Sequence, residues 1–202
     1  MKEINTIIFD IGKVLIDYDW KKFALSIFDD DEILVDKMMD AMYGHGVWDE
    51  LDRGVWTIDQ LIDGFLQYEP SLEKEFRKYL EESAKALIQF PFTKTWLHEL
   101  KERGYQLLFL SNYSHHMMDR NPECLDFLPL MDGGIFSCDV KLIKPNPEIF
   151  KLLIEQYNLT PSKCVFLDDK SENVNTAISL DFNGIVVTDH DSASKKLEDL
   201  LG

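Results

Sequence analysis

The sequence contains few cysteines, and their pattern excludes a disulfide framework and a cysteine-rich metal site. Only three of the 202 residues are cysteine, namely Cys124, Cys138 and Cys164. Their number is odd and their spacing does not match the paired cysteines of zinc sites. Such scattered cysteines are typical of reduced thiols in a cytoplasmic protein. We therefore expect a cytoplasmic chain that is held together by its hydrophobic core.

Basic residues are also scarce. The 21 Lys and Arg are outnumbered by 37 Asp and Glu, which gives a net charge of −16 at pH 7. This charge repels nucleic acids and anionic membranes. No apolar stretch approaches the length that spans a bilayer, and residues 1–5 lack a signal-peptide pattern. We expect neither a nucleic acid nor a membrane as partner, and a bound phosphate would need a divalent cation, a helix N-terminus and one or two lysines.

The remaining composition is that of a globular protein, with 45% apolar and 29% charged residues. The length suffices for one substantial core, or for one domain with a smaller satellite. Composition does not decide the oligomeric state, so both a monomer and a homodimer stay open.

The order of apolar segments predicts an α/β fold. Helical periodicity over residues 92–103, 147–157 and 171–180 alternates with short apolar runs that are typical of buried parallel strands. The four clear runs and a shorter fifth candidate are residues 4–9, 105–110, 163–167, 184–188 and 135–138. This alternation predicts a doubly wound, Rossmann-like parallel sheet.

One interval is too long for this scheme. A strand–helix–strand crossover needs about 30 residues, and the interval from the first to the second strand is far longer. We predict a core domain of residues 1–16 and 91–202, with an inserted helical cap domain of residues 17–90. The large apolar residues of the insert should form the core of the cap. They are Phe23, Leu25, Ile27, Phe28, Leu34, Met38, Met39, Met42, Leu61, Ile62, Phe65 and Leu66.

Polar residues follow the carboxyl ends of the predicted strands, where open α/β sheets bind their ligands. They include carboxylates, which are the hard oxygen ligands that Mg²⁺ prefers, and groups that bind phosphate. These residues are Asp10, Ser111, Asn112, Asp168 and Asp169, and Lys144 stands ahead of the predicted helix at 147. Taken singly, each has an ordinary interpretation as a turn, a helix cap or a surface residue. Their coincidence at one edge of the sheet favours a site for phosphate and Mg²⁺.

These residues lie in segments that resemble a known family. In order and spacing, residues 10–15, 110–112, 144–145 and 166–169 resemble the four motifs of the haloacid-dehalogenase (HAD) superfamily. The resemblance covers the whole chain, because the helical insert is similar to the cap of that superfamily. Within it, residues 9–12 and 50–54 resemble the branch of bacterial α-glucose-1-phosphate phosphatases and the N-terminal phosphatase domains of epoxide hydrolases.

The resemblance implies a Mg²⁺-dependent hydrolase of a small phosphomonoester, with a sugar phosphate as the expected substrate. Asp10 would attack phosphorus and form an aspartyl-phosphate. The resemblance assigns Mg²⁺ to the Asp10 carboxylate, the Gly12 carbonyl and Asp169, with Asp168 behind or sharing the ion and Asn173 in support. The phosphoryl oxygens would be held by Ser111, the backbone N–H of Asn112 and Lys144, which also offsets the carboxylate charge.

Gly12 departs from the pattern of the family. Most phosphatases of the superfamily have Asp at this position, where it protonates the leaving alcohol and later activates water. General acid–base catalysis contributes a factor of about 10²–10⁴ in rate. The proton must therefore come from elsewhere, with Asp17, Asp19 and a residue of the cap as candidates, unless the leaving group needs little help, as an anomeric sugar oxygen does.

Three further questions stay open at the level of sequence. Arg53 in the cap is a candidate to contact a substrate hydroxyl or a second anion, with an exposed salt bridge as the equal alternative. A metal-independent 2-haloacid dehalogenase would need no proton donor, although the pair of Asp168 and Asp169 favours the metal-dependent phosphatase. A further alternative is a weakly active or non-catalytic protein that binds a phosphometabolite.

Overall fold

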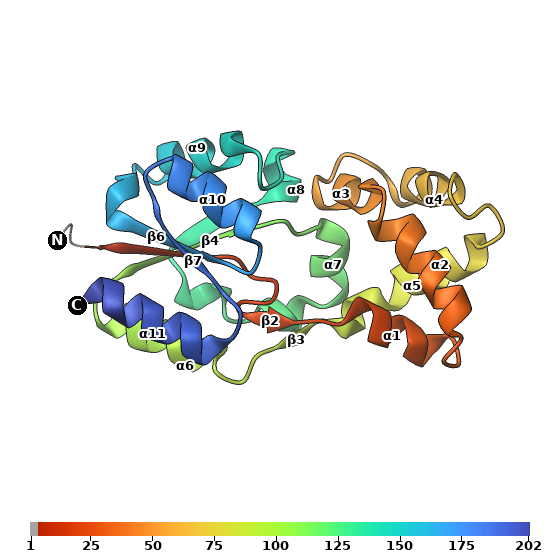
Figure 1. The fold of residues 1–202 in the computed structure, drawn as a ribbon, viewed down its shortest axis with the longest axis horizontal. Coiled ribbons are helices and arrows are strands. Elements are labelled where there is room, and N and C mark those ends of the chain that lie inside the picture. The colour runs from red at the N-terminus through yellow and green to blue at the C-terminus, as the bar shows by residue number, and fades with distance from the viewer. Residues whose placement is uncertain (1–3) are drawn as a thin grey trace.

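The computed structural model describes residues 4–202 and contains a five-stranded parallel sheet (Figure 1). The order of its strands is β5-β4-β1-β6-β7. Their bounds are Thr6–Phe9 for β1, Gln106–Ser111 for β4, Gly133–Phe136 for β5, Cys164–Asp168 for β6 and Asn183–Val186 for β7. β1 pairs in parallel with both β4 and β6, so the carboxyl ends of these three strands meet at one edge.

Helices cover both faces of this sheet. Figure 1 shows α9 and α10 on one face and α6 and α11 on the other. Alternate residues of β1 point to the two faces: Ile8 packs in the cluster with α9 and α10, whereas Ile7 and Phe9 belong to the larger cluster that includes α6 and α11. The bounds are Thr93–Glu102 for α6, Pro147–Gln156 for α9, Ser171–Ser179 for α10 and His190–Leu201 for α11. The predicted doubly wound α/β architecture is confirmed.

Local chemistry explains where these helices begin and end. The Asn146 side chain caps α9 by accepting a hydrogen bond from the backbone N–H of Glu148, and Pro147 occupies the first turn. Gly104 follows α6 with a φ of +88°, a conformation that favours glycine. The predicted strand at residues 135–138 is displaced, because Ser137 and Cys138 begin the short helix α8, Ser137–Val140, instead of extending β5.

A separate group of helices, here called the cap, lies at one end of the sheet (Figure 1). Its members are α1 at Trp20–Ile27, α2 at Glu32–Tyr43, α3 at Val47–Asp52, α4 at Ile58–Leu66, α5 at Glu73–Glu82 and the 3₁₀ helix η1 at Ser83–Ala86. The chain enters and leaves this group through two strands, β2 at Ile16–Asp17 and β3 at Ile88–Gln89, which pair antiparallel. This ribbon falls close to the predicted boundaries of the insert, whose status as a separate domain stays a proposal.

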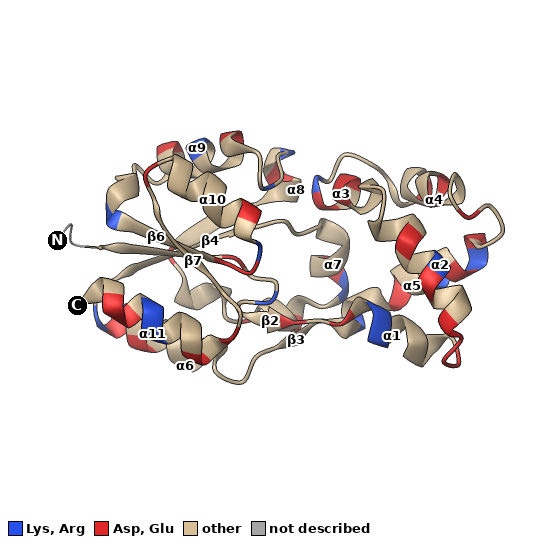
Figure 2. Cartoon of the chain, in the orientation of Figure 1, with Lys and Arg blue, Asp and Glu red and all other residues tan. Residues whose placement is uncertain are grey.

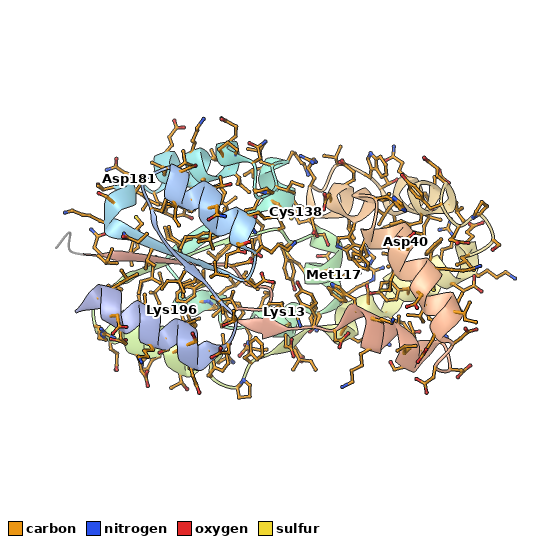
Figure 3. All side chains as sticks on the ribbon, in the orientation of Figure 1. Lys13, Asp40, Met117, Cys138, Asp181 and Lys196 are labelled. Atoms are coloured by element: carbon orange, nitrogen blue, oxygen red, sulfur yellow. The ribbon has the colours of Figure 1, made fainter. Side chains whose placement is uncertain are left out.

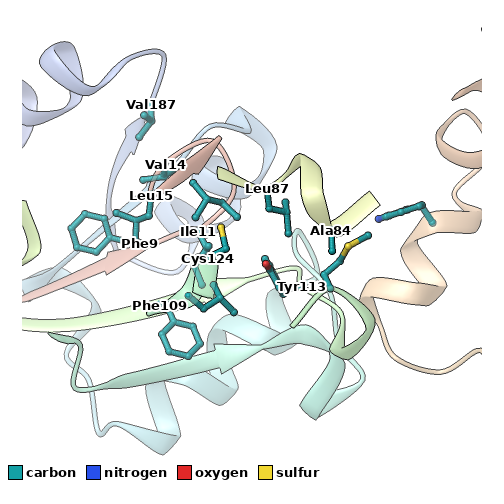
Figure 4. Packing of buried hydrophobic residues seen from close by; sticks show 14 of the residues in the cluster. Phe9, Ile11, Val14, Leu15, Ala84, Leu87, Phe109, Tyr113, Cys124 and Val187 are labelled. Atoms are coloured by element: carbon teal, nitrogen blue, oxygen red, sulfur yellow. The ribbon is translucent and has the colours of Figure 1, made fainter. Parts of the chain in front are cut away.

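The apolar residues predicted for the core of the cap are buried to different degrees. Met38, Met42, Leu61, Ile62 and Phe65 are fully buried, and the other seven are partly buried against the same cluster. α5 adds two fully buried aromatic residues that the periodicity did not single out, Phe76 and Tyr79. The apolar cluster continues from the cap into the core. Figure 4 shows Ala84 and Leu87 on the cap side of this packing and Phe9 on the sheet side.

The remaining elements connect the core to the cap. α7 at His115–Arg120 follows β4, and the buried ring of His116 makes a hydrogen bond of 2.8 Å to the carbonyl of Leu80 in the cap. Met117, labelled in Figure 3, lies with its sulfur 3.8 Å from the Ser83 hydroxyl. Three further 3₁₀ turns are η2 at Pro122–Leu125, η3 at Leu128–Leu130 and η4 at Pro161–Lys163.

The distribution of acidic residues and the state of the cysteines agree with what the composition predicts. Asp and Glu are spread over the core and the cap (Figure 2). All three cysteines are buried and free, as predicted. Within residues 4–202, every helix is too short or too polar to cross a membrane.

Candidate active site

A cavity of about 270 Å³ lies where the carboxyl edge of the sheet meets the cap. Both parts of the molecule contribute to its walls. The core supplies Asp10, Gly12, Ser111, Asn112, Tyr113, Lys144, Asp169, Lys170 and Asn173, and the segment that leads into the cap supplies Tyr18. The helices of the cap supply Trp20, Tyr43, Trp48, Asp49 and Asp52. The cavity therefore joins the predicted phosphate and metal residues to a wall of aromatic and acidic side chains.

Lys144 is the centre of a buried ionic network. Its Nζ lies 2.9 Å from Oδ1 of Asp10 and 2.6 Å from Oδ2 of Asp168. Lys144 is only 3% exposed and Asp168 is fully buried. A buried cation between two buried carboxylates is stable only while all three are present, because each lone charge would be poorly solvated. The network therefore fixes the Asp10 carboxylate against the end of β6.

Asp168 is held by more than Lys144. Asn173 Nδ2 lies 3.0 Å from both of its carboxylate oxygens, and the backbone N–H of Lys170 donates to Oδ1 at 2.8 Å. These bonds occupy both oxygens of Asp168. Asp169 lies beside it, is partly buried and lines the cavity directly. Asp168 is thus suited to position its neighbours, while Asp169 is more available to a ligand.

The electrostatics of the nucleophile candidate combine burial with opposing charges. Burial raises the pKa of Asp10, the charge of Lys144 lowers it and the charge of Asp168 raises it again, so that the pKa reaches about 6. Burial lowers the pKa of Lys144, but the carboxylates of Asp10 and Asp168 outweigh it and hold the pKa above its ordinary value. Lys144 therefore stays protonated and can offset negative charge at this edge.

The acidic residues fit a divalent cation. One carboxylate oxygen from each of Asp10, Asp168 and Asp169 lies within 4.8 Å of the others. Burial raises the pKa of Asp169, and the charge of Asp168 raises it further. Three crowded carboxylates with a single lysine leave excess negative charge, which a hard cation such as Mg²⁺ would neutralise. Asp10 and Asp169, which the sequence predicted to share one ion, are close enough to do so.

The second predicted motif reaches the same place. Ser111 ends β4, is 1% exposed and lowers the pKa of Asp10 through a hydrogen bond from its hydroxyl. The side chain of Asn112 accepts from the backbone N–H of Lys144 at 2.8 Å and donates to its carbonyl at 3.0 Å. Asn112 therefore anchors the segment that carries Lys144, a function of its side chain that the motif alone did not reveal.

Gly12 faces a tyrosine instead of open space. A Cβ built at Gly12 would lie 3.1 Å from Cε1 and 3.5 Å from the hydroxyl oxygen of Tyr18. Burial raises the pKa of Tyr18 strongly, and the charge of Asp10 raises it further, so that the phenol stays protonated. The tyrosine ring therefore fills the space beside Gly12 where a longer side chain would begin.

The cap contributes a carboxylate that sequence reasoning did not single out. Asp52 at the end of α3 lines the cavity, and burial raises its pKa to about 7, with Asp49 raising it further. Only its place within residues 50–54 pointed to it. Arg53, the predicted cap residue, lies 3.4 Å from Glu50 in an ion pair and is absent from the described residues that line the cavity. The structure thus shows a salt bridge for Arg53, although it is partly buried and not exposed as that alternative had it.

Aromatic rings form the wall opposite the phosphate and metal residues. Tyr18 and Trp20 stack with their ring centroids 4.6 Å apart, and Trp48 lies 6.0 Å from Trp20 and 4.7 Å from Tyr43. Rings of this kind pack against the C–H faces of a ligand and offer hydroxyl or indole N–H groups at their edges. The cavity can therefore hold a charged group at the core and a larger organic group at the cap.

A family model described as haloacid dehalogenase-like hydrolase matches residues 4–181. The chain is 32% identical over 171 residues to acyl-CoA dehydrogenase family member 10 of Mus musculus and 30% identical over 160 residues to bifunctional epoxide hydrolase 2 of Sus scrofa. These matches include 75% and 68% of this chain but only 15% and 29% of the two relatives.

A third relative has a similar length. The chain is 28% identical over 200 residues to D-ribitol-5-phosphate phosphatase of Bacteroides thetaiotaomicron, with 89% of each chain covered.

The solved structures support the fold. A HAD-like hydrolase from Porphyromonas gingivalis aligns with a TM-score of 0.75 at 21% identity and 98% coverage of both chains. A HAD family enzyme from B. thetaiotaomicron, in complex with magnesium and inorganic phosphate, aligns with a TM-score of 0.68 at 22% identity, covering 90% of this chain and 93% of that one. The L-2-haloacid dehalogenase of Xanthobacter autotrophicus also aligns, with a TM-score of 0.62 at 15% identity, covering 97% and 83%.

Proposed function

We propose that this chain, which belongs to the haloacid dehalogenase-like hydrolase family, is a Mg²⁺-dependent phosphatase of a small phosphomonoester. The proposal depends on one observation above all. Asp10 is fixed by Lys144 while its carboxylate stands within 4.8 Å of Asp168 and Asp169 at the mouth of a cavity. This arrangement places a nucleophile, a cation site and a positive charge around the position of one phosphoryl group.

The core residues would carry out the transfer. An oxygen of Asp10 attacks phosphorus, the bond from phosphorus to the substrate oxygen breaks, and the phosphoryl group remains on Asp10. Lys144 and Ser111 stabilise the charge of the phosphoryl oxygens. Asp10, Asp169 and the carbonyl of Gly12 would hold Mg²⁺, which supplies charge neutralisation when bound. Water then attacks phosphorus, inorganic phosphate leaves and the Asp10 carboxylate is restored.

The cap supports a polyhydroxylated substrate. The stacked rings of Tyr18 and Trp20 offer a flat surface to carbon-bound hydrogens, and the carboxylates of Asp49 and Asp52 can accept hydrogen bonds from hydroxyl groups. A cavity of about 270 Å³ suits a small molecule. Two curated relatives are named D-ribitol-5-phosphate phosphatase and phosphorylated carbohydrates phosphatase. We therefore propose a phosphorylated sugar or polyol as the substrate.

A panel of phosphorylated sugars, polyols and nucleotides, assayed for phosphate release with Mg²⁺ and with EDTA, tests this function. We expect turnover of at least one sugar or polyol phosphate that requires Mg²⁺ and disappears in the Asp10→Asn variant. Equal phosphate release by the variant and the wild type would contradict the catalytic function of Asp10. Binding of the same compounds without turnover would instead support the phosphometabolite-binding protein.

One observation favours a second function, a 2-haloacid dehalogenase. Gly12 offers no acidic side chain beside Asp10, and a halide leaves without protonation. The fold does not separate the two functions, since it is shared with a solved dehalogenase. The cluster of Asp10, Asp168 and Asp169 favours the phosphatase, because a dehalogenase has no cation to neutralise three carboxylates. Chloride release from 2-chloropropionate in EDTA would reverse this preference.

A further inference from the structure

The structure leaves a phosphatase of this design without an acidic side chain at residue 12, next to the segment that carries its nucleophile. Gly12 has no side chain, and the room next to it is taken by the ring of Tyr18, whose Cε1 lies 3.1 Å from a Cβ built at that position. Tyr18 itself is a poor proton donor, because burial and the charges of Asp10 and Asp169 raise its pKa strongly. The alkoxide of a polyol, or of a sugar phosphorylated away from its anomeric carbon, is a strong base, so its departure requires a proton from another residue.

The acids that neighbour Gly12 in sequence are used elsewhere. Asp17 is exposed and forms a 2.7 Å ion pair with Lys13, and it also accepts a hydrogen bond from the backbone N–H of Tyr18. Asp19 is exposed and caps α1 by accepting from the backbone N–H of Lys22 at 2.9 Å. Neither Asp17 nor Asp19 is among the described residues that line the cavity. The local segment therefore does not replace the missing acid.

The cap presents a carboxylate to the cavity at a fixed position. The Ser137 hydroxyl in α8 donates to the backbone carbonyl of Asp52 at 2.5 Å and accepts from the backbone N–H of Tyr113 at 2.9 Å. Close by, Lys141 donates to the carbonyl of Gly54 at 2.7 Å. The two bonds of Ser137 connect the end of α3 to Tyr113 in the loop after β4, the strand that ends in Ser111. Among residues 4–202, no hydrogen bond or ion pair involves the Asp52 carboxylate.

We propose that Asp52 is the proton donor and acceptor of the reaction, supplied by the cap in place of a side chain at residue 12. The inference depends on the phosphatase function proposed above. In the first step the protonated carboxyl of Asp52 gives its proton to the substrate oxygen as the bond from that oxygen to phosphorus breaks, and the alcohol leaves. In the second step the Asp52 carboxylate takes a proton from the water that attacks phosphorus. Asp52 is then protonated again, and the sum is ester plus water giving alcohol plus phosphate.

The charges around Asp52 suit a group that exchanges a proton near neutral pH. Burial and Asp49 raise its pKa to about 7, Lys170 lowers it, Asp10 raises it and Lys144 lowers it. Three tyrosines that line the same cavity remain neutral there, because burial raises their pKa values. The tyrosines on which the charge of Asp52 acts are Tyr18, Tyr43 and Tyr113.

The experiment compares two leaving groups in the wild type and in the Asp52→Asn variant. The substrates are an alkyl phosphate, such as ribitol 5-phosphate or the best sugar phosphate of the panel, and p-nitrophenyl phosphate, whose phenolate leaves without a proton. We expect the variant to lose a factor of about 10²–10⁴ in kcat/KM on the alkyl phosphate. Pre-steady-state release of p-nitrophenolate should stay close to the wild-type rate, followed by slow turnover, because the second step also needs Asp52.

The pH dependence adds a readout that a merely structural residue would not change. For the wild type on the alkyl phosphate, kcat/KM should fall as the pH rises through about 7, since Asp52 must be protonated in the first step. This fall of kcat/KM at high pH, the alkaline limb of the profile, should be absent for Asp52→Asn. A matched control is Asp63→Asn, which removes an exposed carboxylate from α4 of the cap and should leave both substrates and the limb unchanged.

The outcomes separate this inference from the proposed function. If the wild type is active, Asp10→Asn is inactive and Asp52→Asn is as active as the wild type on the alkyl phosphate, only the assignment of Asp52 is overturned. An equal loss on both substrates, including the p-nitrophenolate burst, also overturns it, because it indicates a structural effect. A wild type without phosphatase activity contradicts the proposed function itself.

Discussion

The two walls of the cavity differ in how their charged groups are held. On the core side, Lys144 and Asp168 are buried and fully engaged, with Lys144 bonded to Asp10 and Asp168 bonded also to Asn173. On the cap side, Asp49 is exposed and Asp52 is only partly buried, without an ionic partner for Asp52 in the described residues. The difference agrees with the division of labour proposed above, in which the core residues bind and transfer the phosphoryl group and the cap protonates the group that leaves.

This division predicts that damage to the core affects all substrates alike. The largest effect is expected for Asp10→Asn, which removes the nucleophilic oxygen but keeps the shape of the side chain. Phosphate release should fall on the order of 10⁴-fold or more, whether the leaving group is an alkoxide or a phenolate. Steady-state assays of both substrates measure this, with circular dichroism to check folding. A loss confined to one substrate would break the comparison.

The next effect in size concerns the contribution of Lys144 to the stability of the fold. Lys144→Met leaves Asp10 and Asp168 buried without their cation, which should cost on the order of 3–5 kcal/mol in the free energy of unfolding. The cost should be smaller at pH 5 than at pH 8, because the pKa of Asp10, about 6 beside Lys144, rises further without that cation and Asp10 is then neutral at pH 5. Urea unfolding of the wild type and the variant at pH 5 and pH 8 measures both. An unchanged stability at pH 8 would show that the network contributes nothing.

On the cap side the expected effects are smaller and depend on the substrate. Trp20→Leu removes the ring that stacks on Tyr18 at 4.6 Å. A lost aromatic contact of about 0.5–1.5 kcal/mol should raise KM for a sugar phosphate by roughly 2–10-fold. Inhibition by inorganic phosphate should not change, because phosphate contacts the core only. A matching loss of affinity for phosphate would contradict the separation of the two walls.

The smallest effect is a shift of pH dependence through Asp49. Its negative charge raises the pKa of Asp52, so Asp49→Asn should lower that pKa. Asp52 would then lose its proton at lower pH, and the alkaline limb of kcat/KM should move in the same direction. Measuring kcat/KM against pH for the wild type and Asp49→Asn on one alkyl phosphate shows the shift. A limb that moves to higher pH would show that a different group titrates.

The core half of this site was predictable from sequence because strand ends fix positions. Asp10, Ser111 and Asp168 end adjacent parallel strands, so their convergence follows once the order β4-β1-β6 is assumed. Lys144 lies outside any strand, and its place depends on the bonds from Asn112, which a motif does not state. The same logic predicted the five strands of the parallel sheet, with small shifts of their ends, among them the one where Ser137 begins a helix.

The cap half could not be predicted in the same way. Which cap side chains enter the cavity depends on how α3 packs against α8, and this is set by tertiary contacts such as the bond from Ser137 to the carbonyl of Asp52. Residues 50–54 resemble a segment of the family, but only Arg53 was named there as a candidate, because helical periodicity does not tell which face of a short helix meets the core. Tyr18 was missed because Gly12 gave no sign of what occupies the space beside it.

The measurement that tests the central claim most directly is the detection of the covalent intermediate. Wild-type protein is mixed with Mg²⁺ and p-nitrophenyl phosphate, quenched in acid within the first turnover, digested and examined by mass spectrometry. The account predicts one added phosphoryl group on the peptide that contains Asp10, and none in Asp10→Asn. A protein that releases phosphate while this peptide stays unmodified at every quench time would contradict nucleophilic attack by Asp10.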